Sequence, residues 1–146
     1  MRKIKYLIIH CSATPEGREH TAADICRWHK QRGFRKIGYH YTISIDGIVE
    51  GGRGLKEAGA HTIGRNSDSI GVCYIGGCDK NMKPKNTLTN RQNDMLKRIV
   101  GECIMLYPDI LIAGHNQFSS KSCPSFDVEK WCKETGINDK NIYKPK

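Results

Sequence analysis

The chain has 146 residues, with 24 Lys and Arg against 15 Asp and Glu, a formal net charge of +9 and a pI near 9.3. Its length is typical of one domain, and 38% apolar with 27% charged residues is typical of soluble globular proteins. It has no run of about 18 apolar residues, so we expect no membrane insertion. The absence of a fixed-period repeat excludes collagen-like, coiled-coil and solenoid proteins.

The beginning of the chain and the cysteines indicate the compartment. The apolar run Tyr6–Ile9 after the basic start is shorter than the roughly 7–15 residues of a signal-peptide core. We therefore expect synthesis in the cytoplasm without a signal peptide. The seven cysteines lack paired CxxC spacing, which argues against a disulfide scaffold or a zinc finger and predicts reduced thiols.

The positive charge is spread along the chain rather than gathered in one run. Such a surface can attract an anionic cell wall or nucleic acid, or can simply keep the protein in solution. No helix-turn-helix, zinc-finger or RNA-recognition motif accompanies the charge, so we expect no specific nucleic-acid partner.

The first half of the chain predicts a strand, a helix and a hairpin. The apolar run Tyr6–His10 predicts a buried strand that ends at a histidine. Thr21 followed by Asp24 is typical of a capping box and predicts a helix over about 22–32, with Gly33 just past its end. The segments that flank Asp46-Gly47, Tyr39–Ile45 and Ile48–Glu50, predict a hairpin. A surface loop follows over Gly51–Asp68.

The middle of the chain predicts a strand, a loop and a long helix. Ile70–Ile75 reads as an apolar strand, and the polar segment Asp79–Asn86 reads as a loop. Thr89 and Gln92 form a second capping box ahead of a helical apolar period that Pro108 stops.

The last part of the chain completes an α/β pattern. Ile110–Ala113 predicts a third strand, and a helix over about 126–134 is expected between a Ser125 cap and Gly136. The order of elements predicts a single α/β domain over 1–136, with a central mixed β-sheet flanked by about three helices. Residues 137–146 read as a loose, basic C-terminal tail.

Three side chains form a candidate metal site. His10 and His115 each follow an apolar strand directly, and Cys123 comes eight residues after the second histidine. Sites of open α/β sheets lie at the carboxyl ends of strands, and two imidazoles with one thiolate suit zinc with a water as fourth ligand. The spacing fits equally a satisfied histidine and a buried thiol. Cys11 should point to the other face of its strand and is not expected to be a ligand.

Several stretches in this order resemble the amidase-2 family of N-acetylmuramoyl-L-alanine amidases, which includes amidase-type phage lysozymes and peptidoglycan-recognition proteins. The resemblance runs from about residue 5 to 133. It is carried by the segments Ile8–Thr14, Gly38–Tyr41, Asp46–Glu50, Gly59–His61, Asn66–Val72, Gly114-His115 and Lys121–Asp127.

The resemblance implies one catalytic zinc ion held by His10, His115 and Cys123, with Tyr39 and Lys121 beside it. It implies hydrolysis of the amide between the lactyl group of N-acetylmuramic acid and L-alanine in peptidoglycan. A lysine there could stabilise the oxyanion of the tetrahedral intermediate.

The general base is left open between two residues. Tyr39 could orient or deprotonate the water, or donate a hydrogen bond to the intermediate. Glu50 is the nearest carboxylate candidate on the hairpin and ranks below the tyrosine as a base; it is also a candidate substrate contact. His61 and Asn66 fall where family members line the substrate cleft, although both could equally brace the loop.

One departure from the family pattern is Asn116, since many relatives have a charged, often acidic, residue after the second histidine. A carboxylate there could orient a ligand histidine. We expect a monomeric, phage-type lytic enzyme that acts on the cell wall after release. A non-catalytic peptidoglycan-binding module and a cytoplasmic amidase that recycles wall fragments are the alternatives.

Overall fold

A five-stranded mixed sheet organises the molecule, a computed structural model that describes residues 2–145. Its strand order is β4-β3-β5-β1-β7. Strands β3, β5, β1 and β7 are parallel, and only β4, at one edge, is antiparallel. The bounds are β1 (Tyr6–Cys11), β3 (Tyr41–Ile43), β4 (Val49–Gly51), β5 (Ser69–Tyr74) and β7 (Leu111–Gly114). The predicted mixed α/β sheet is confirmed.

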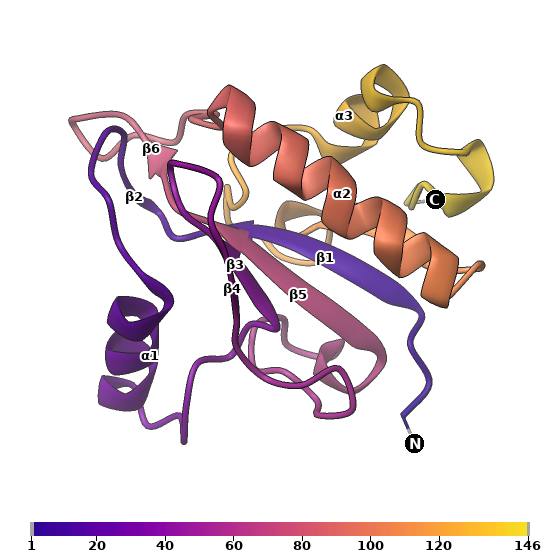
Figure 1. The fold of residues 1–146 in the computed structure, drawn as a ribbon, viewed down its shortest axis with the longest axis horizontal. Helices are drawn as coiled ribbons and strands as arrows, with labels where there is room; N and C mark the ends of the chain where they lie inside the picture. Colours follow the sequence, from indigo (N-terminus) through magenta and orange to yellow (C-terminus); the bar gives the residue numbers. More distant parts are fainter. Residues whose placement is uncertain (1, 146) are drawn as a thin grey trace.

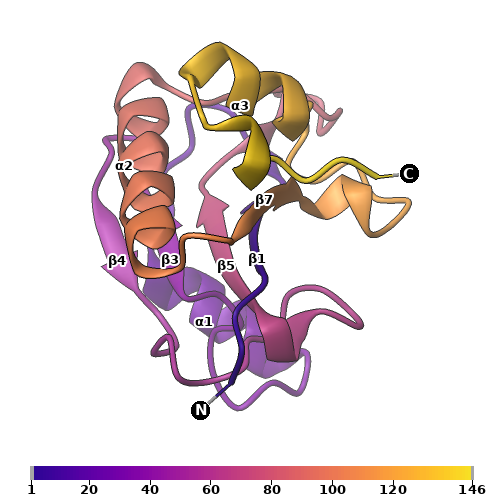
Figure 2. The same cartoon turned by 90° about the vertical axis from the view of Figure 1, so that its right-hand side faces the viewer.

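Three α-helices cover the two faces of this sheet (Figures 1 and 2). The long α2 (Asn90–Leu106) and α3 (Val128–Thr135) lie on one face, and α1 (Ala22–Gln31) lies on the other. A small second sheet pairs β2 (Thr14–Pro15) with β6 (Gly77–Cys78). Short 3-10 turns occupy Asn66–Asp68, His115–Gln117 and Asp139–Asn141.

Side chains that alternate between the two faces of the central strands form two separate hydrophobic cores. On β1, Leu7, Ile9 and Cys11 face the larger core with α2 and α3. On β5, Val72 faces that core, whereas Cys73 belongs to the smaller core under α1. Because side chains alternate across a strand, His10 lies on the α1 face, away from its neighbour Cys11, as predicted.

The first two helices begin where the sequence predicts. Thr21 with Asp24 and Thr89 with Gln92 both form capping boxes, in which each side chain bonds the other residue's backbone N–H. The predicted hairpin is confirmed as the antiparallel pair β3–β4, with Gly47 at a φ of 84° in its turn. Its first strand, Tyr41–Ile43, is shorter than the predicted Tyr39–Ile45, and its second strand is shifted by one residue, to Val49–Gly51.

The start of α3 differs from the prediction. Asp127 rather than Ser125 caps the helix, through an Oδ1 that accepts from the Lys130 N–H. Ser125 has a left-handed φ of 70°, and its hydroxyl donates to the Gly77 carbonyl instead. The helix ends at Gly136 in the left-handed region, as predicted.

The prediction of a loose tail is wrong for residues 137–145. Asn141 and Ile142 are buried, and the latter forms a parallel bridge with Ile112 of β7. The Asn141 amide also donates to the carbonyls of Pro108 and Ile110. This segment therefore covers the outer edge of β7, which would otherwise present unpaired backbone groups.

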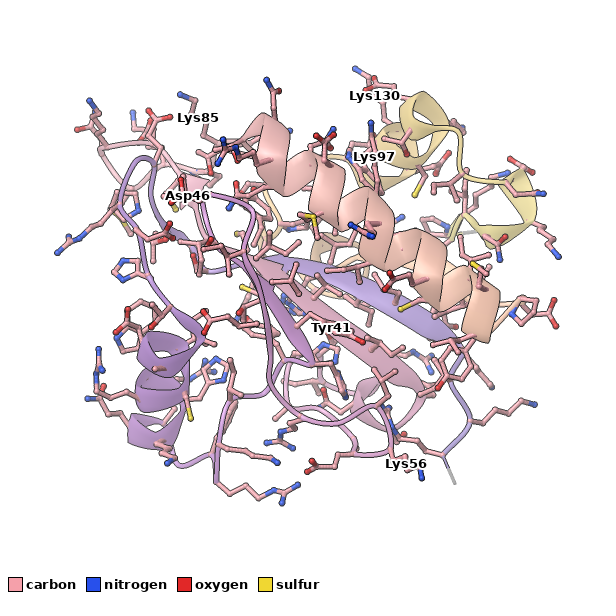
Figure 3. The ribbon with its side chains drawn as sticks, in the orientation of Figure 1. Tyr41, Asp46, Lys56, Lys85, Lys97 and Lys130 are labelled. Atoms are coloured by element: carbon pink, nitrogen blue, oxygen red, sulfur yellow. The ribbon has the colours of Figure 1, made fainter. Side chains whose placement is uncertain are left out.

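The basic side chains are dispersed over the molecule, as the sequence indicates. Lys85, Lys97 and Lys130 project on the side of α2 and α3, and Lys56 projects at the opposite end (Figure 3). Among the described residues, none of the helices is long and apolar enough to cross a bilayer.

Candidate metal and substrate site

Three potential metal ligands meet at the carboxyl ends of β1 and β7. His10 is the penultimate residue of β1, His115 follows β7 directly, and Cys123 lies on the loop before α3. One ligand atom from each lies within 4.8 Å of the other two. The His10 Nδ1 and the Cys123 Sγ are 3.7 Å apart, and the two imidazole centroids are 4.6 Å apart.

These three side chains fit a zinc ion. Tetrahedral zinc, with bonds of about 2.1 Å to nitrogen and 2.3 Å to sulfur, places its ligand atoms about 3.5 Å apart. The Nδ1 of His115 is buried and has no hydrogen-bond partner, which is costly for a polar atom unless something binds it. The Cys123 Sγ accepts a hydrogen bond of 3.2 Å from the Cys11 N–H, which favours a thiolate, whereas the Cys11 side chain and burial raise the pKa of this thiol.

The surroundings keep the two imidazoles neutral. Burial lowers the pKa of His10 well below 6.5, and His61 and His115 lower it further. Burial also lowers the pKa of His115, with a contribution from Lys121. Neutral imidazoles keep a lone pair for a metal, so this environment favours ligation.

A cavity of about 580 Å³ opens over the three candidate ligands. It is bounded by the end of β1, the carboxyl end of α1, the loop over 60–66 and the segment that carries His115 and Cys123. Its charged lining residues within the described part of the chain are Arg32 and Lys121, both cationic. The cavity therefore suits a ligand that carries carboxylates.

Both predicted catalytic residues line this cavity. The Tyr39 ring centroid lies 5.0 Å from that of His10. Burial raises the pKa of Tyr39 well above 10, with a further contribution from Cys73, so its Oη keeps its proton and can donate a hydrogen bond. Lys121 is exposed at the rim, two residues before the candidate ligand Cys123.

The two predicted substrate contacts line the cavity but are also engaged with the protein. The Asn66 Oδ1 accepts from the backbone N–H groups of His61 and Thr62, at 2.8 and 2.9 Å. This is the loop-bracing alternative that the sequence left open. His61 lies behind His10, with its Nδ1 2.8 Å from the His10 Nε2.

Glu50 does not line the cavity. It lies on the edge strand β4, and its Oε1 accepts from the Ala22 N–H at the start of α1. A carboxylate at a helix amino terminus is favourable on its own account. The prediction of Glu50 as a substrate-binding or base residue is therefore not supported.

Sequence reasoning missed two residues around the ligands. The Thr62 Oγ1 lies 3.2 Å from the His10 Nε2. No local sequence pattern predicts this contact, because the two residues are far apart in the chain. His29 also lines the cavity, and its Nδ1 accepts from the Gly38 N–H. Its position one turn after the buried Ile25 placed it on the inner face of α1.

Comparison with known proteins defines the class of this fold. The N-acetylmuramoyl-L-alanine amidase family model matches residues 1–126. The endolysin of Enterobacteria phage K11 is 39% identical over 125 residues, which cover 86% of this chain and 83% of that protein. The fold is that of N-acetylmuramoyl-L-alanine amidase LysC from Clostridium intestinale, with a TM-score of 0.79, 24% identity and coverage of 94% and 88% of the two chains.

A Drosophila peptidoglycan-recognition protein LB variant, solved in complex with tracheal cytotoxin, has the same fold. It aligns with a TM-score of 0.73 and 26% identity over 85% of this chain and 76% of that one. The chain belongs to the N-acetylmuramoyl-L-alanine amidase family, known as amidase-2.

Proposed function

We propose that the protein is a zinc-dependent N-acetylmuramoyl-L-alanine amidase of the phage-endolysin type. It hydrolyses the amide that joins the lactyl group of N-acetylmuramic acid to L-alanine in peptidoglycan. The observation that carries the proposal is the cluster of His10, His115 and Cys123 at the floor of the cavity, with an unpartnered imidazole nitrogen inside it. A zinc ion held there would lower the pKa of a water molecule to about 7 and polarise the scissile carbonyl.

The chain's own residues would bind and polarise the substrate. Lys121 can reach over the cavity from its rim, and its ammonium would stabilise the negative charge that develops on the carbonyl oxygen. Tyr39 keeps its phenolic proton and would donate a hydrogen bond from Oη to the reacting group. The cationic lining suits the carboxylates of a stem peptide, so we assign the peptide to the cavity.

The relatives support the same context. Phage endolysins align over most of this chain, which favours a lytic enzyme made in the cytoplasm that acts on the wall after release. The complex of peptidoglycan-recognition protein LB with tracheal cytotoxin favours the same cavity as the binding site for a wall fragment. Peptidoglycan is thus the proposed partner.

The test is the release of new L-alanine amino termini from purified peptidoglycan. We expect termini that disappear with a chelator and return with added zinc. Cys123→Ala should lose both zinc and activity, since it removes the only sulfur among the three ligands. Cys26→Ala is the matched control, because this cysteine lies on α1 outside the cavity and should leave both unchanged.

Two outcomes would contradict the proposal. If Cys123→Ala retained one full zinc ion, the ligand assignment would be wrong. If the wild-type protein co-sedimented with sacculi but released no amino termini, it would be a non-catalytic binding module.

A further inference from the structure

The geometry points to a hydrogen-bond chain, from Ser69 through His61 to His10, that sets which nitrogen of His10 is free to bind a metal. His61 is then a positioning residue that acts through His10, in place of the substrate contact predicted from the sequence. The inference rests on the proposed metal site, but it concerns the part of that site that lies behind the ligands.

The hydrogen-bond chain begins at the Arg65 carbonyl oxygen, which can only accept a hydrogen bond. The Ser69 Oγ lies 2.6 Å from the Arg65 carbonyl oxygen, so the hydroxyl must donate its proton there. The same Oγ lies 3.3 Å from the His61 Nε2. With its proton committed to the carbonyl, the oxygen can only accept, so the His61 Nε2 carries the hydrogen.

The protonation of His61 then determines which nitrogen of His10 carries the hydrogen. A neutral imidazole that carries its hydrogen on Nε2 has a lone pair on Nδ1. This Nδ1 lies 2.8 Å from the His10 Nε2, which must therefore donate. Thr62 supports the same direction, since its Oγ1 lies 2.9 Å from the His61 Nδ1 and 3.2 Å from the His10 Nε2. The hydroxyl can donate to the former and accept from the latter.

The result is a lone pair on the metal side of His10. Its Nδ1, which faces the Cys123 Sγ at 3.7 Å, is left without a proton. A histidine ligand of this kind needs no tautomer change before it binds a metal.

The His61 ring packs against two backbone positions, Gly59 and Gly71, where a side chain would clash with it. A Cβ at Gly71 on β5 would lie 2.6 Å from the His61 Cδ2, and one at Gly59 would lie 2.5 Å from the same atom. Carbon atoms do not approach this closely, so both positions leave room for the ring. Asn66 fixes the backbone of the loop through the N–H groups of His61 and Thr62.

The experiment compares His61→Leu with His61→Asn, two side chains of nearly the same shape. Only the asparagine can restore an acceptor where the imidazole Nδ1 stood. We expect zinc affinity, measured by competition with a chelator, to fall by about 10- to 100-fold in the leucine variant. It should stay within about threefold of wild type in the asparagine variant, as expected when an equivalent acceptor is present.

A second measurement needs neither zinc nor substrate. Imidazole nitrogen NMR of the metal-free full-length protein should show His10 protonated at Nε2 and unprotonated at Nδ1, with assignment from the spectrum of His10→Gln. In Ser69→Ala, which removes the anchor but leaves the His61 ring, the opposite tautomer of His10 should become populated. If the leucine variant does not fold, the NMR comparison of wild type with Ser69→Ala tests the inference by itself.

The outcomes separate this inference from the proposed function. A proton on the His10 Nδ1 in the wild type, or equal loss of zinc in His61→Leu and His61→Asn, would overturn the inference even if the amidase is active. A clear leucine–asparagine contrast, in a protein that binds zinc but releases no L-alanine, would support the inference and overturn the proposed function.

Discussion

Replacing Lys121 by alanine separates transition-state stabilisation from metal binding. The side chain is exposed at the cavity rim and is not one of the three clustered ligands. We therefore expect Lys121→Ala to retain one zinc ion. Loss of its ammonium group should slow the step in which negative charge develops on the substrate carbonyl oxygen.

The magnitude follows from the change in surroundings when substrate fills the cavity. Two unit charges about 4 Å apart attract by about 1 kcal/mol in water and by about 4 kcal/mol at an effective dielectric constant of 20. The difference of about 3 kcal/mol corresponds to a rate loss of about 10²-fold. The range for loss of one oxyanion donor is about 10²- to 10³-fold in kcat.

The assay is the rate of L-alanine amino-terminus release, with zinc content measured on the same samples. Lys130→Ala is the control, because this lysine is exposed on α3 and does not line the cavity. Near-normal turnover of a zinc-loaded Lys121→Ala protein would refute the role given to this residue. Because Lys121 contributes to the low pKa of His115, the variant should also release metal at a higher pH on acidification.

Three further predictions concern the tyrosine, the pH dependence and the core. Tyr39→Phe should keep its zinc and lose about 10-fold or more in turnover; unchanged turnover would exclude a role for its hydroxyl. Burial lowers the pKa of His29 to about 4 and that of His61 to about 3, so the unfolded chain binds more protons below pH 6.5. The free energy of unfolding of the metal-free protein should fall with pH from about 6.5 downward, and a flat profile in urea titrations would contradict this. Leu96→Ala, at a fully buried position of α2, should cost about 2–5 kcal/mol of stability in the same titrations; a cost under about 1 kcal/mol would show that the site collapses.

The elements with local physical causes could be predicted from the sequence. The capping boxes at Thr21 and Thr89 and the turn at Gly47 depend on a few neighbouring residues, and all three are present. The same holds for two candidate ligands, because His10 and His115 end apolar strands that must lie side by side in a parallel sheet. Strand ends that share one sheet edge bring their side chains together.

The features that depend on distant contacts could not be predicted. Glu50 is close in sequence to the hairpin turn, but the edge position of β4 turns it to α1. Ile142 gives no periodic pattern within a Lys-rich segment, and only the exposed edge of β7 explains its burial. Serine is a favourable helix N-cap residue, but the Ser125 hydroxyl donates to the Gly77 carbonyl instead.

Asn116 shows how a departure from a family pattern acquires a physical reason. Its Nδ2 donates to the Phe126 carbonyl at 3.2 Å and lies 3.5 Å from the Ser122 carbonyl. It thus ties the residue after one candidate ligand, His115, to the loop that carries another, Cys123. A carboxylate at this position has no proton to donate and would face two carbonyl oxygens instead.

The two candidate histidine ligands are therefore held in different ways. His10 is oriented from behind by the chain through His61, whereas the buried Nδ1 of His115 has no protein partner. A metal would satisfy that nitrogen, and the amide of Asn116 would keep Cys123 within reach of it. One candidate ligand is thus oriented by the fold alone, and the geometry of the other two candidates depends on the loop after β7.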